Sequence, residues 1–191
     1  KFAPIKYQLA RAYLQDNNAA QAAVILKEAI TANPDYAEAI LLLGEINLQS
    51  GDAKPVVASM LGLLKKRPDL VQAQLLVAQA YHSLGRLDDA TAVFREQIKV
   101  SPQSLRPHLL LGLVLRQQNK IDEARKAFES AHQLAPDSLL PVAQLVDLDI
   151  QSKDFAAAFQ RIQKQLHETP ASPGAHFLKG KIYAAQGKWD N

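Results

Sequence analysis

The sequence predicts an all-α fold, a solenoid of antiparallel helix pairs built from a 34-residue unit. Three observations predict it. Proline recurs at a spacing of 34 residues, at Pro34, Pro68, Pro102, Pro136 and Pro170. Small and bulky apolar residues recur at fixed positions in each unit, and turn residues stand between the apolar runs. Self-similarity at one period indicates supersecondary units that stack on copies of themselves.

The units follow from counting so that each recurring proline stands at position 32. They are 3–36, 37–70, 71–104, 105–138 and 139–172, with a partial unit at 173–191. No linker or second domain interrupts them, so we expect a single array over 1–191. The chain begins at Lys1 without an initiator Met and ends just after a turn signal, so we expect it to be a fragment of a longer protein.

The first helix of each unit, helix A, is predicted from an apolar run with small residues at one position. The predicted A helices are 4–15, 37–50, 71–84, 105–118, 139–152 and 174–186. Position 8 reads Ala10, Gly44, Ala78, Gly112, Val146 and Gly180. Position 7 beside it is mostly bulky, from Leu9 to Leu145, with Lys179 in the last unit. A small residue between bulky ones lets two helix backbones approach closely.

A tight turn is predicted after each helix A. The turn residues are Asp16-Asn17-Asn18, Gly51-Asp52, Gly85-Arg86, Asn119-Lys120, Lys153-Asp154 and Gly187-Lys188. Glycine and asparagine tolerate the left-handed backbone that ends a helix. A following aspartate can cap the next helix. The turn therefore reverses the chain from helix A to a second helix.

The second helix, helix B, is predicted at 19–32, 53–66, 87–100, 121–134 and 155–168. Position 20 is small (Ala22, Val56, Ala90, Ala124, Ala158), and position 24 is bulky (Leu26, Met60, Phe94, Phe128, Ile162). The recurring proline ends the helix because it pushes the preceding residue out of the α region.

The pattern resembles the tetratricopeptide repeat family, which places W-x2-L-G-x2-Y, A-x3-F and P at these offsets. The resemblance covers the whole chain. Position 4 is never Trp, and the Tyr of position 11 stands only at Tyr13, Tyr81 and Tyr183, with Asn47 and Asp149 in two other units. The resemblance implies a right-handed superhelix whose A helices line a concave groove, and a non-enzymatic scaffold that binds a partner protein or peptide there.

The resemblance also implies which side chains face the groove, namely positions 2, 5, 9, 12 and 13 of helix A. The candidate partner-binding residues are Tyr7, Arg11, Leu41, Glu45, Leu75, Gln79, His82, Arg106, Leu109, Leu113, Arg116, Asp147, Phe177 and Lys181. Position 5 forms a nearly unbroken apolar stripe, which is either a binding floor or packing between A helices. Arg106, Arg116 and Lys120 either bind an anionic segment or form a solvated charged face.

One known binding mode is excluded by the residues. Chaperone-binding members of this family carry a two-carboxylate clamp of Lys and Asn on the A helices. The corresponding positions of the first three units hold Tyr7 and Arg11, Glu45, and Gln72 and Leu76, none of which matches. That clamp is therefore absent.

Several chemistries lack their residues in this chain. Cysteine is absent, and no two of the five histidines lie four apart on one predicted helix, so we expect no metal and no cofactor. No nucleophile or phosphate-binding motif occurs, which predicts that the chain is not an enzyme. The net charge of +3 without long basic runs argues against nucleic acid. No apolar stretch is long enough to span a membrane.

Two alternatives to a groove-binding scaffold stay open. Solenoid ends expose apolar helix faces, so the chain could be a structural subunit that forms a homo-oligomer end to end. It could also be the targeting module of a larger enzyme. The runs Leu145–Asp149 and Ala185–Trp189 resemble bacterial repeat proteins of exopolysaccharide and exosortase systems, which are often envelope lipoproteins. We therefore expect a bacterial protein of the cytoplasm, or of the periplasm and cell envelope.

Overall fold

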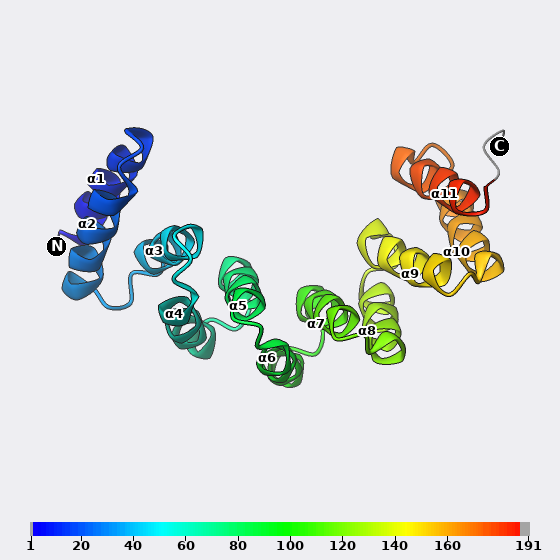
Figure 1. The fold of residues 1–191 in the computed structure, drawn as a ribbon, viewed down its shortest axis with the longest axis horizontal. Helices are drawn as coiled ribbons and strands as arrows, with labels where there is room; N and C mark the ends of the chain where they lie inside the picture. The colour runs from blue at the N-terminus through cyan, green and yellow to red at the C-terminus, as the bar shows by residue number, and fades with distance from the viewer. Residues whose placement is uncertain (1, 188–191) are drawn as a thin grey trace. The chain divides into compact units, whose positions relative to one another are not determined.

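The computed structural model describes residues 2–187, and within that range the fold is all-α, as the sequence predicts (Figure 1). The helices are α1 (Ala3–Gln15), α2 (Ala19–Ala32), α3 (Ala37–Gln49), α4 (Ala53–Lys66), α5 (Val71–Ser83), α6 (Leu87–Val100), α7 (Leu105–Gln117), α8 (Ile121–Leu134), α9 (Leu139–Gln151), α10 (Phe155–Glu168) and α11 (Pro173–Ala185). The predicted B helices agree with α2, α4, α6, α8 and α10 residue for residue. The predicted A helices differ from the odd-numbered helices by one residue at most. Lys188 and Trp189, which the sequence patterns include, lie outside the described residues.

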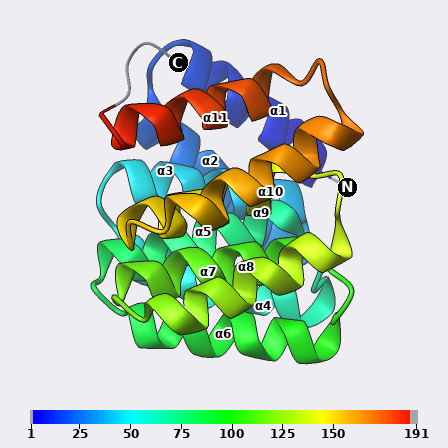
Figure 2. The ribbon, with the colours of Figure 1, turned by 90° about the vertical axis from the view of Figure 1, so that its right-hand side faces the viewer.

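The helices pack into two compact parts, residues 1–93 and residues 94–191. In the first part α1 lies against α2, and α3 against α4. In the second, α7 lies against α8, α9 lies against both α8 and α10, and α11 contacts α9 and α10. Figure 2 shows α11 beside α10. The predicted pairs α1–α2, α3–α4, α7–α8 and α9–α10 are thus confirmed, while the α5–α6 pair, which the boundary after residue 93 divides, and the single array over 1–191 stay predictions.

The turns between paired helices repeat one backbone conformation. Residues with positive φ occur at Asn17 (57°), Gly51 (83°), Gly85 (68°), Asn119 (59°), Lys153 (58°) and Gly187 (73°), at the predicted turn positions. Glycine and asparagine adopt this conformation readily, whereas lysine does so at a cost. Side-chain capping of the B helices differs between units. The side chain of Asn18 accepts a hydrogen bond from the backbone N–H of Gln21, and that of Asp154 accepts one from the N–H of Ala157. Asp52 makes no such bond.

The recurring prolines end the B helices as predicted. Each B helix stops two residues before its proline, and the residue between lies outside the α region where its backbone is described, with φ −146° and ψ 94° at Asn33. The proline carbonyl also has a role in three units. It accepts a hydrogen bond from the position-4 side chain: Gln74 to Pro68 (2.7 Å), His108 to Pro102 (3.1 Å) and His176 to Pro170 (2.9 Å). Each of these bonds ties helix A to the end of the preceding helix B.

The core of each part forms where small and bulky residues interlock. All position-20 and position-24 side chains are fully buried, at 0% exposure. A Cβ added to Gly44 would lie 3.0 Å from Met60 Cε, and one added to Gly112 would overlap the ring of Phe128. Gly112 is therefore required by the Phe128 ring beside it, whereas a Cβ on Gly44 would touch the flexible end of Met60, and no described atom lies within 4 Å of a Cβ built on Gly180. None of the described helices is both long and apolar enough to cross a bilayer.

Candidate functional site

The first candidate site is the A-helix face, which we define as the side chains at positions 2, 5, 9 and 12 of α1, α3, α5, α7, α9 and α11. In the 1–93 part, the position-5 side chains differ in how deeply they are buried. Tyr7 is half-buried, with its ring edge against Tyr36 at 5.6 Å and the Arg11 guanidinium 6.0 Å above it. Leu41 is buried, at 6% exposure, and Leu75 is half-buried. Leu41 offers little surface to a partner, whereas Leu75 offers more.

The polar residues of this part lie beside that stripe. Glu45 accepts a hydrogen bond from the side-chain amide of Gln72 on α5, which bridges α3 and α5. Gln79 and His82, on α5, are exposed. Glu45 therefore serves partly to join neighbouring A helices.

In the 94–191 part the A-helix face carries large exposed apolar side chains. Phe177 on α11 is 71% exposed, and Leu140 on the neighbouring α9 is 62% exposed. Leu109 and Leu113 on α7 are half-buried. Leu140 stands at position 2 and was missing from the predicted residues, although position 2 faces the groove in the family. Isolated exposed apolar residues are ordinary, but two on adjacent helices favour an interaction surface.

Three of the predicted charged residues form a row of ion pairs across this part. Arg116 on α7 lies 4.0 Å from Asp147 on α9, and Lys181 on α11 donates to the same carboxylate at 2.6 Å. Arg106 is half-buried on the first turn of α7. The positive charge of Arg116 thus has an internal carboxylate partner, which weakens the interpretation of this region as an anion-docking site.

A buried charge cluster was not predicted from the sequence. Asp149 on α9 has only 1% of its side chain exposed. Its carboxylate accepts a hydrogen bond from Arg125 on α8 and another, of 2.8 Å, from Nε of Arg161 on α10. Glu129 accepts from Arg161 at 3.5 Å. The signal in the sequence was an aspartate at position 11, where tyrosine stands in three other units. A buried carboxylate needs such partners, because an unpaired buried charge is very unfavourable.

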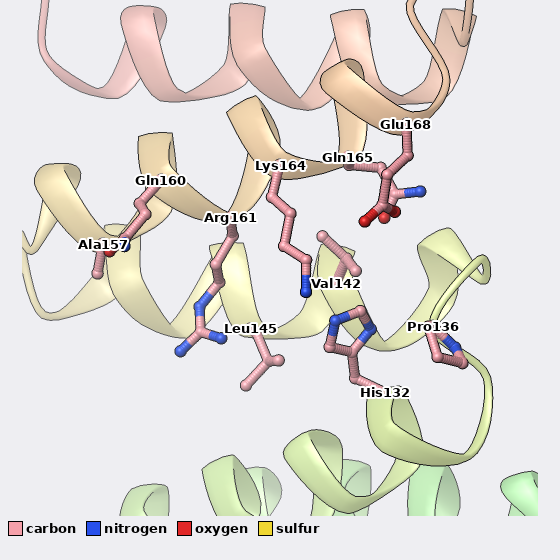
Figure 3. Close-up of a pocket in the computed structure, with 10 residues that line it drawn as sticks. All are labelled: His132, Pro136, Val142, Leu145, Ala157, Gln160, Arg161, Lys164, Gln165 and Glu168. Atoms are coloured by element: carbon pink, nitrogen blue, oxygen red, sulfur yellow. The ribbon is translucent and has the colours of Figure 1, made fainter.

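A pocket of about 430 Å³ opens beside this cluster, between α8 and α10 and over α9 (Figure 3). Its lining residues are His132, Pro136, Val142, Leu145, Ala157, Gln160, Arg161, Lys164, Gln165 and Glu168. Burial, together with the nearby charges of Lys164 and Arg161, holds the pKa of His132 below its ordinary value, while Glu168 acts in the opposite direction. The pocket therefore favours the neutral imidazole.

A second pocket, of about 510 Å³, lies between α2 and α4 over α3 in the 1–93 part. It occupies the same place in the repeat. Both pockets occur where position 4 is aliphatic, Ile40 or Val142, and makes no bond to the proline carbonyl. Position 11 is short and polar in the same two units, Asn47 and Asp149.

Within residues 2–187, no group of three or more His, Asp or Glu side chains could hold a metal ion. The convergent charged groups at Asp149 are engaged with arginines instead of facing a reactive partner.

Comparison with protein families identifies the repeat. A family model described as a tetratricopeptide repeat matches residues 13–80 and 115–182, and a second with the same description matches 71–104. No curated protein matches the chain. The fold is shared with many solved structures.

Three of these structures represent the likeness. The tetratricopeptide repeat protein TTC0263 of Thermus thermophilus is 20% identical, covers 96% of this chain and 98% of its own, and has a TM-score of 0.62. PilF of Pseudomonas aeruginosa is 20% identical, with coverage of 98% and 86% and a TM-score of 0.67. YrrB, described as having an unusual peptide-binding site, is 13% identical, with coverage of 91% and 90% and a TM-score of 0.59. The family match, the repeated helix pairs and this shared fold show that the chain belongs to the tetratricopeptide repeat family.

Proposed function

We propose that this protein is a non-enzymatic scaffold that binds a peptide segment of a partner protein on its A-helix face. The observation that carries the proposal is the exposure of Phe177 and Leu140 on neighbouring helices of the 94–191 part. Exposed apolar anchors with a polar rim are typical of protein-binding surfaces.

The charged side chains at the rim of this surface are already paired with one another. The Arg116–Asp147–Lys181 row lies on the same three A helices as Leu109, Leu140 and Phe177. Ion pairs made before binding fix the rotamers of long side chains, which lowers the ordering cost when a peptide binds. YrrB, which shares the fold, is described as binding a peptide, and this likeness supports a peptide as the ligand class.

The test is selection from a displayed random-peptide library followed by affinity measurement on variants. The double variant Leu140→Glu, Phe177→Glu changes two exposed anchors, so its helices should still form. The matched control is Val24→Glu, Val100→Glu, because these apolar residues are 48% and 58% exposed on B helices. Selected peptides are expected to bind the control like wild type and the Leu140/Phe177 variant at least tenfold more weakly. Equal binding to all three proteins would contradict the proposal.

Self-association is a second candidate, favoured by one face of α1. Ile5 is 65% exposed, whereas the same position in other units, Ala39, Ala73 and Ala175, is fully buried. Phe2 and Leu9 on this face are also exposed, at 66% and 45%. Light scattering over a concentration series tests it: a second copy on this face gives dimers that Ile5→Glu, Leu9→Glu abolishes. A monomer at every concentration would contradict self-association.

A further inference from the structure

The pocket between α8 and α10 has the form of a ligand site on the B-helix side, away from the A-helix face. Its floor is made by Val142 and Leu145 of α9, which are 3% and 0% exposed. Its volume of about 430 Å³ lies within the range of small-ligand sites. A buried apolar floor below polar walls is suited to hold one side chain in a defined position.

Nitrogen-bearing side chains converge on this pocket from both of its walls (Figure 3). His132 comes from α8, and Arg161, Lys164 and Gln165 come from α10. Nδ1 of His132 is buried and lacks a hydrogen-bond partner in the described part of the chain. A buried polar atom without a partner is unfavourable, so a ligand that supplies one gains binding free energy.

Charged groups of both signs surround the pocket. The carboxylate of Glu168 lines it and would compete with an anionic ligand. The cations are Arg125, Arg161 and Lys164, and the carboxylates are Glu129, Asp149 and Glu168. Arg125 and Arg161 both contact Asp149, and Arg161 also contacts Glu129. Burial is the main cause that lowers the pKa of His132; the charges of Lys164 and Arg161 lower it further, and Glu168 opposes them.

The equivalent pocket between α2 and α4 shows that the fold does not require these charges. The positions of His132, Arg161 and Lys164 are occupied there by Ile30, Ser59 and Gly62. The two pockets share their place in the repeat and differ in chemistry. Lys27 and Lys66 line the α2–α4 pocket at other positions, so it is the combination of His132, Arg161 and Lys164 that is specific to the α8–α10 pocket.

We propose that the α8–α10 pocket binds the side-chain carboxylate of an Asp or Glu in a partner peptide, with Lys164, Arg161 and His132 as the donors. Hydrogen bonds from charged donors to a carboxylate are about twice as strong as neutral ones. A neighbouring apolar residue of the peptide would lie toward Val142 and Pro136. This site is separate from the A-helix face, so either can bind without the other.

The test uses a fluorescein-labelled peptide of alternating leucine and glutamate, acetylated and amidated at its ends, and a glutamine version as control. Wild type is expected to bind the glutamate peptide at least tenfold more tightly. Lys164→Glu should remove that preference, and Glu168→Gln should strengthen it. The matched control is Lys126→Glu, which makes the same charge change on an exposed residue of α8 outside the pocket. Equal binding of both peptides, or equal losses in Lys164→Glu and Lys126→Glu, would overturn the proposal.

A third peptide distinguishes a side-chain carboxylate from the carboxylate at a peptide's C-terminus. It is the glutamine peptide with a free C-terminal carboxylate, and the proposal expects it to bind as weakly as its amide. Tight binding of this peptide would overturn the assignment to an acidic side chain.

The imidazole of His132 gives a local readout by NMR. A bound carboxylate stabilises the protonated ring, so the glutamate peptide should raise the pKa of His132. Binding without any change at His132 would place the peptide elsewhere and overturn the proposal.

Discussion

Arg161 donates from Nε to Oδ2 of Asp149 across 2.8 Å, and Asp149 has only 1% of its side chain exposed. Arg125 donates to the other carboxylate oxygen from α8. One buried carboxylate thus joins α8, α9 and α10, at the position where three other units place a tyrosine. The two arginines keep 26% and 28% of their side chains exposed, so the cluster lies at the edge of the core.

Removing this carboxylate should destabilise the 94–191 part. Asp149→Ala leaves two arginines without their shared partner, and we expect a loss of about 3 kcal/mol in the free energy of unfolding. Urea denaturation measures it. The control is Glu96→Ala, which breaks an exposed pair with Lys99 and should change stability by less than about 1 kcal/mol. Equal effects of the two variants would show that the buried cluster has no special role.

Two glycines should respond oppositely to the same change. A Cβ at Gly112 would overlap the ring of Phe128, so Gly112→Ala should cost about 1–3 kcal/mol. Nothing lies within 4 Å of a Cβ built on Gly62, so Gly62→Ala should add about 1 kcal/mol through helix propensity. Thermal unfolding compares them. Introducing Phe128→Leu should reduce the cost of Gly112→Ala, and no such coupling would contradict the packing explanation.

The turn after α9 holds a strained residue. Lys153 has φ 58°, where the other units place glycine or asparagine. Lys153→Gly removes the Cβ that makes this conformation unfavourable and should stabilise the protein by about 1 kcal/mol. Lys153→Ala keeps the Cβ and should change little. Chemical denaturation of both variants checks this, and a stabilisation by alanine equal to that by glycine would contradict the strain.

The titration of His132 should make stability depend on pH. Because its folded pKa lies below the unfolded value of about 6.5, the unfolded chain binds more protons as pH falls. Stability is therefore unaffected by this group above that pH and decreases as pH falls from about 6.5 toward the folded pKa. His132→Gln should lessen the decrease in unfolding free energy between pH 8 and pH 5. An unchanged pH dependence in His132→Gln would contradict the pKa direction.

The sequence predicted the helices well because their ends depend on nearby residues. Proline and the turn residues act within two or three positions, so the B-helix bounds needed no knowledge of the tertiary structure. The burial of position 5 was harder: Leu41 is buried and Phe177 exposed although both stand at one repeat position. That difference depends on which neighbours each helix has.

The charge cluster and the pocket could not be read from local spacing. Asp149 meets Arg161, 12 residues away, and Arg125, 24 residues away, on different helices. A search for histidines four apart overlooks His132, because the residues that face it come from another helix. The useful signal was the aspartate at position 11, which indicates partners without identifying them.

The most direct test of the scaffold function is amide chemical-shift mapping with a peptide selected on the wild-type protein. We expect the largest changes on α7, α9 and α11, around Leu109, Leu140 and Phe177. Changes confined to the B helices, or no saturable change, would contradict the assignment of the A-helix face as the binding surface.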